Sequence, residues 1–67
     1  MAESLIVTDP EIMLGKPVIA GTRVTVELIL EKLACGETPE QIFRGHPQLP
    51  PKSIEAALSY AAALVRN

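Results

Sequence analysis

The sequence predicts a mainly α-helical domain, in which a three-helix unit of the helix-turn-helix kind follows a short N-terminal β-hairpin or pair of β-strands. Three observations support this fold class. Apolar residues repeat at helical spacing over 26–33, a Thr-Pro-Glu-Gln capping sequence occupies 38–41, and 50–67 is rich in alanine. We expect all 67 residues to form one domain, with strands and turns in 1–24 and the trihelical unit in 25–67.

The N-terminal third is predicted to contain two short strands. Residues 5–8 and 17–21 are apolar runs with β-branched residues, and turn-forming residues lie between them. Pro10 ends the first run, because proline lacks an N–H and disfavours the helical conformation at the preceding residue. Residues 11–14 are compatible with either a helical turn or a bend. An isolated pair of strands is marginal in water, so it should need a helix or another chain to cover it.

The first expected helix begins at Thr25 as the N-cap and ends before Gly36, whose left-handed conformation would close it. Its buried stripe follows i, i+3, i+4, i+7 spacing and consists of Val26, Ile29, Leu30 and Leu33. Leu28 and Cys35 lie off this stripe, on the opposite face. They are either isolated apolar residues on a solvent-facing side or contacts to a partner.

The second expected helix is short. Thr38 is its N-cap, Gln41 completes a capping box, and Gly45 and Pro47 end it. The third helix should bury a stripe made of Ile54, Ala57, Leu58, Ala61 and Val65.

The sequence gives little support for catalysis, a metal site or a cofactor. The single histidine, His46, lies in a Gly-His-Pro turn, and the single cysteine, Cys35, closes a helix. No nucleophile–base pair or zinc ligand set is evident. The net charge of −2 does not describe a strongly basic nucleic-acid binder. No signal peptide or membrane-spanning run is recognisable, so we expect a cytoplasmic protein with no membrane partner and no small-molecule substrate.

A helix-turn-helix unit would place its third helix in the major groove of DNA. The candidate nucleic-acid contacts on that helix are Lys52, Ser53, Ser59 and Arg66. Groove-reading donors are sparse there, and Glu55 would face phosphates unfavourably. A helical bundle packed on a protein partner is therefore at least as well supported as base recognition.

The segments 9–33, 36–49 and 54–62 together resemble the bacterial domain of unknown function 433 (DUF433), most specifically in "GKPVIAGTRVTV". The resemblance covers about residues 8–63. It implies a homeodomain-like trihelical unit preceded by short strands, and an antitoxin of VapB type, often encoded beside a PIN-like toxin. The matching positions are Gly15, Pro17, Gly21, Thr22, Arg23, Gly36, Pro47 and Leu49.

The chain departs from the family pattern in two places. Leu14-Gly15 stands where the family usually has two glycines. The third helix usually starts with a Thr or Ser cap followed by acidic residues, whereas this chain has Lys52-Ser53 after two prolines. The second departure places a positive charge at the helix start, which slightly favours an anion or a nucleic acid there.

The triplet Gly21-Thr22-Arg23 separates the second strand from the first helix. Gly21 should supply a backbone conformation open mainly to glycine, and the Thr22 hydroxyl should bond within the turn. Arg23 either pairs with Asp9 or Glu27 in the same chain, or makes a bidentate contact to a partner carboxylate or phosphate. The predicted partner-binding residues are Thr22, Arg23, Leu28 and Cys35.

We therefore expect a non-enzymatic, antitoxin-like module that binds a PIN-like toxin, with operator DNA as a further candidate ligand. The alternative is a protein-interaction or assembly module without nucleic-acid binding. The small core, the lone strands with open edges and the Leu28–Cys35 face also predict a homodimer.

Overall fold

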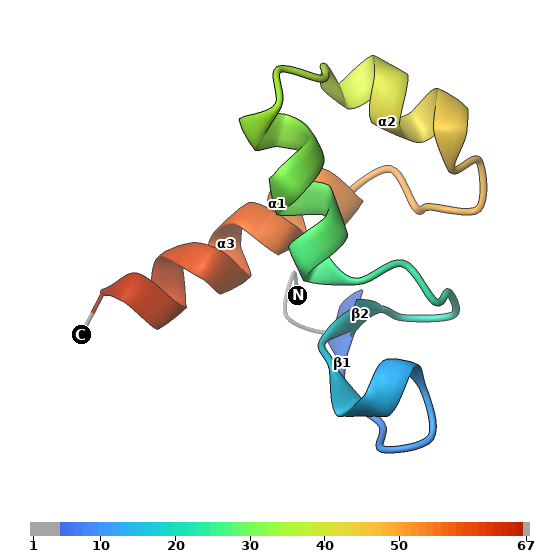
Figure 1. Ribbon diagram of the computed structural model, residues 1–67, viewed down its shortest axis with the longest axis vertical. Coiled ribbons are helices and arrows are strands. Elements are labelled where there is room, and N and C mark those ends of the chain that lie inside the picture. Colours follow the sequence, from blue (N-terminus) through green and yellow to red (C-terminus); the bar gives the residue numbers. More distant parts are fainter. Residues whose placement is uncertain (1–4, 67) are drawn as a thin grey trace.

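The computed structural model describes residues 5–66, which form a mainly helical fold of three helices and a small antiparallel sheet (Figure 1). The sheet consists of β1 (Ile6–Val7) and β2 (Val18–Ile19), joined through a one-turn segment, η2 (Met13–Gly15). The helices are α1 (Val26–Ala34), α2 (Pro39–Gly45) and α3 (Ser53–Val65). The predicted mainly helical class, with a short N-terminal hairpin, is confirmed.

The hairpin is anchored on the helical unit by β2. Ile6 lies opposite Ile19 and Val7 opposite Val18. Both residues of β2 are buried, whereas Val7 of β1 is exposed. The covering helix that so small a sheet needs is α3, which packs against β1.

Local capping interactions set the start of α1 as the sequence predicted. The Thr25 hydroxyl accepts a hydrogen bond from the Leu28 N–H at 3.0 Å, which satisfies one donor of the first helical turn. Beyond the helix, Gly36 has a φ of 93°, a left-handed conformation that residues with a Cβ rarely adopt.

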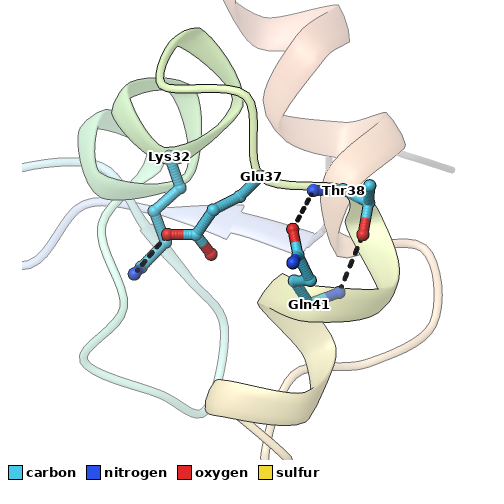
Figure 2. Close-up of polar contacts among 4 residues, drawn as sticks. All are labelled: Lys32, Glu37, Thr38 and Gln41. Carbon is cyan, nitrogen blue, oxygen red and sulfur yellow. Dashed lines mark hydrogen bonds and ion pairs between the residues drawn. The ribbon is translucent and has the colours of Figure 1, made fainter.

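A complete capping box fixes the start of α2. The Gln41 N–H donates to the Thr38 hydroxyl at 3.2 Å, and the Thr38 N–H donates to Gln41 Oε1 at 2.8 Å (Figure 2). Just before it, Lys32 Nζ lies 3.2 Å from Glu37 Oε2. The ion pair connects α1 to the residue before the α2 cap, and the capping box satisfies N–H groups at the start of α2.

The core is aliphatic and centred on α1, which packs against both α2 and α3. Its buried members are Ile19, Val24, Val26, Ile29, Ile42, Leu49, Ile54 and Ala57. Leu28 also packs against this cluster and is partly buried. Its predicted place on a face opposite the core is therefore wrong. A short helix with neighbours on more than one side buries a wider face than a single stripe.

The buried stripe predicted for α3 is correct only in its first half. Ile54 and Ala57 are buried, but Leu58 and Val65 are 49% and 80% exposed. For Val65, Figure 1 shows the cause: the C-terminal half of α3 projects beyond the other elements. Helical periodicity predicts which side of a helix is apolar, but not how far along its length a neighbour covers it.

Candidate functional site

The turn that carries Arg23 is held by its neighbour Thr22. The Thr22 hydroxyl donates to the Ile19 carbonyl at 2.8 Å and accepts from the Val24 N–H at 3.0 Å. Gly21 has a φ of 79°, so a side chain at this position would be strained. The conformations predicted for Gly21 and Thr22 are confirmed. Arg23 therefore lies in a turn that hydrogen bonds hold at residues before and after it.

Arg23 is exposed, and it forms no ion pair within residues 5–66. The two carboxylates proposed as intrachain partners are engaged elsewhere. Lys16 Nζ lies 3.1 Å from Glu27 Oε1, and Asp9 Oδ1 accepts the Glu11 N–H at 2.9 Å. The intrachain alternative for Arg23 is therefore absent from this part of the chain. Within residues 5–66, its guanidinium therefore keeps its donors for another molecule.

A second unusual feature is the left-handed backbone of η2, which precedes β2. Met13 has a φ of 49° and Leu14 a φ of 59°. A left-handed conformation costs roughly 1–2 kcal/mol for a residue with a Cβ. Leu14 gains no burial in return, because it is 93% exposed. The sequence signal for this site was the leucine in place of the usual first glycine.

The predicted nucleic-acid contacts do not form one exposed cluster. Ser53 is fully buried, and its hydroxyl donates to the Pro50 carbonyl at 2.7 Å. This serine therefore serves the start of α3 and is not accessible to a phosphate. Lys52 is exposed, with its Nζ 3.6 Å from Glu55 Oε1. Ser59 and Arg66 are exposed farther along the helix.

The two apolar residues proposed as partner contacts on α1 differ in their exposure to solvent. Leu28 is partly buried against the core, whereas Cys35 is exposed at the end of the helix. They do not form a common exposed face. Cys35 stays a candidate contact by itself.

An apolar groove that the sequence analysis missed lies between α1 and the projecting half of α3. Its volume is about 370 Å³. Its apolar walls come from Val26, Leu30, Ala34, Tyr60, Ala61 and Leu64. Glu27 and Glu31 of α1 border the groove with the aliphatic parts of their side chains. The sequence signal for the groove was the run 56–65, which has no charged residue. A helix that is apolar on all sides is usually buried on all sides.

Residues 5–66 hold no cluster of three or more His, Cys, Asp or Glu side chains that could bind a metal ion. In the same range, no helix combines the length and the apolar character that crossing a membrane requires.

The chain is similar to known proteins in its sequence and in its fold. The sequence profile described as "Protein of unknown function (DUF433)" matches residues 6–61. The uncharacterized protein y4eO of Sinorhizobium fredii (strain NBRC 101917 / NGR234) is 34% identical over 62 residues, or 92% of this chain and 28% of that protein. The crystal structure of a DUF433 member from Anabaena variabilis ATCC 29413 has a TM-score of 0.81 at 21% identity. This match covers 92% of our chain and 60% of the other. The chain thus spans less than two thirds of either relative, and the crystal structure supports the fold alone.

Proposed function

The chain belongs to the DUF433 family, and from that premise we propose that it is a non-catalytic, antitoxin-like module that binds a PIN-like toxin protein. The observation that carries the proposal is Arg23: an exposed guanidinium on a fixed turn, with no ion pair in residues 5–66. A guanidinium can bind a carboxylate through two parallel hydrogen bonds. Because the turn is already ordered, little backbone entropy is lost when Arg23 is engaged.

The η2 segment gives independent support for a binding role. Strained backbone persists where the surrounding structure enforces it, and it concentrates at binding and switch sites. Leu14 combines that strain with an almost fully exposed apolar side chain. It lies before β2, and Arg23 lies after it, so the two flank the same strand. A protein partner would bury the Leu14 side chain and pair the Arg23 charge.

Replacing Leu14 with Gly is expected to raise the stability of the domain and to weaken its binding to a partner. Glycine removes the left-handed penalty but gives more freedom to the unfolded chain, so the domain should gain about 0.5–1 kcal/mol. Loss of the exposed side chain should weaken partner binding by about tenfold. Urea unfolding measures the first effect and calorimetric titration the second. A less stable Leu14→Gly protein would show that η2 is not strained.

The test of the proposal is direct binding to the product of an adjacent PIN-like reading frame. The two proteins are co-expressed, purified and examined by size exclusion with light scattering. A stoichiometric complex that suppresses the toxin's effect on growth is the expected result. If a correctly folded toxin fails to bind, the antitoxin role is wrong, and the alternative of an assembly module without nucleic-acid binding takes its place.

Operator DNA is the second candidate ligand, and it comes from the homeodomain-like, helix-turn-helix interpretation of the three helices. Its remaining support is the exposure of Lys52, Ser59 and Arg66 on or beside α3. The burial of Ser53 and the proximity of Lys52 to Glu55 weaken it.

Any binding to duplex DNA is expected to depend only weakly on salt. Lys52 and Arg66 are the two predicted contacts that carry positive charge, and two neutralised phosphates per chain give a slope of about −2 in log K against log[salt]. Fluorescence anisotropy at several salt concentrations measures this slope. A slope steeper than about −4 would mean that a basic surface other than this one contacts the phosphates.

A further inference from the structure

We propose that the groove between α1 and α3 receives the projecting half of α3 from a second copy of the chain, with Arg66 of each copy paired to Glu31 of the other. This interface is separate from the Arg23 turn, so it goes beyond the proposed toxin binding and does not depend on it. It engages Arg66, which in the dimer would not contact DNA.

The projecting half of α3 is itself a surface that needs cover. Residues 56–65 contain no charged side chain. Leu64 and Val65 are 64% and 80% exposed. A contiguous patch of exposed apolar side chains is typical of an interface, whereas isolated ones are ordinary surface.

The groove beside this helix end is similar to it in length. The stretch 58–65 is about 12 Å long and the nine-residue α1 about 13 Å, at 1.5 Å per residue. Ala61 belongs to the groove wall, and Ala62 and Ala63 follow it. Alanines allow two helices to approach at the short end of the usual interaxial range. The same segment can therefore supply both the inserted helix and part of the receiving wall.

Charge identifies a second copy as the occupant. Two glutamates of α1 lie at the edge of the groove, and Glu27 is already paired with Lys16. Glu31 is exposed and makes no ion pair within residues 5–66. The exposed cation that follows the projecting helix end is Arg66. An occupant from this same chain thus brings both the apolar side chains and the opposite charge that the groove lacks.

Two-fold symmetry makes this contact reciprocal. In a symmetric dimer, each copy inserts its own α3 and receives that of its partner, so the same surface is used twice. A standard interface covers about 800 Å² per partner, which is roughly a sixth of the 4610 Å² surface of this chain. If only one copy inserted its helix end, less surface would be buried. In the reciprocal arrangement each copy buries both its helix end and its groove.

Sedimentation equilibrium of the full chain, from about 1 µM to about 1 mM, tests the proposal. The wild-type protein should pass from monomer to dimer within this range. Leu64→Glu should raise the dissociation constant at least about tenfold, because it places a charge in the apolar contact. Gln48→Glu adds the same charge at an exposed position outside the groove and should leave the constant unchanged. Circular dichroism confirms that each variant is folded.

Charge reversal identifies the pair itself. Arg66→Glu and Glu31→Arg alone should each weaken the dimer by about fivefold or more, and the double variant should restore it. A wild-type chain that stays monomeric throughout the range overturns the proposal. It is also overturned if Leu64→Glu behaves like Gln48→Glu, or if the double variant is as weak as the single ones.

Discussion

Ile42→Ala is expected to leave the domain largely unfolded near physiological temperature. Ile42 is 1% exposed and is the buried residue through which α2 joins the core. Truncating a fully buried isoleucine costs about 2–5 kcal/mol. The core of a domain this small rarely supplies more than about 3–5 kcal/mol of net stability. The substitution should therefore remove most of the free energy of unfolding, which thermal and urea unfolding followed by circular dichroism will measure.

Leu14→Ala is the matched control for this experiment. It removes a similar volume of aliphatic side chain from a position that is 93% exposed and keeps the same left-handed backbone requirement. Its effect on stability should lie within about 0.5 kcal/mol. If Ile42→Ala cost no more than this control, the aliphatic core described for residues 5–66 would be wrong.

Arg23→Ala is expected to weaken toxin binding by about 2–5 kcal/mol, or roughly 30-fold and more, because it leaves a partner carboxylate unpaired in the interface. Stability should change by no more than about 0.5 kcal/mol, since Arg23 is exposed and has no ion pair within residues 5–66. Calorimetric titration and thermal unfolding of the same preparation measure the two quantities.

Two further variants distinguish the effect of the guanidinium's shape on the affinity from the effect of its charge. Arg23→Lys keeps the charge and loses the planar fork, so it should rescue binding poorly. Arg44→Ala removes an identical side chain from an exposed position on α2 and should change the affinity little. Equal losses for Arg23→Ala and Arg44→Ala would mean that the partner responds only to net charge.

The features that were predicted from the sequence are those decided by neighbouring residues. Thr25 and Thr38 bond to N–H groups three residues away, and Gly21 and Gly36 adopt conformations that their own lack of a Cβ allows. Such interactions need no knowledge of the rest of the fold. The mainly helical class followed from these signals together with the apolar periodicity.

The incorrect predictions depended on distant neighbours. Leu28 packs inward because α1 has more than one neighbouring element, and Val65 is exposed because the C-terminal end of α3 projects beyond the other elements (Figure 1). Ser53 was predicted to contact nucleic acid, but its hydroxyl donates a hydrogen bond to the Pro50 carbonyl of the same chain. Helical spacing carries no information about the position of these neighbours. The groove was missed for the same reason.

The most direct test of the central claim, a partner carboxylate bound by Arg23, is a double-mutant cycle on the complex with the PIN-like toxin. Arg23→Ala is combined in turn with alanine substitutions of the toxin's surface carboxylates, and the affinity of each pair is measured. We predict that one carboxylate couples to Arg23 by at least about 1.5 kcal/mol. Coupling energies within about 0.5 kcal/mol of zero for every carboxylate would mean that Arg23 does not bind one, and would contradict the account.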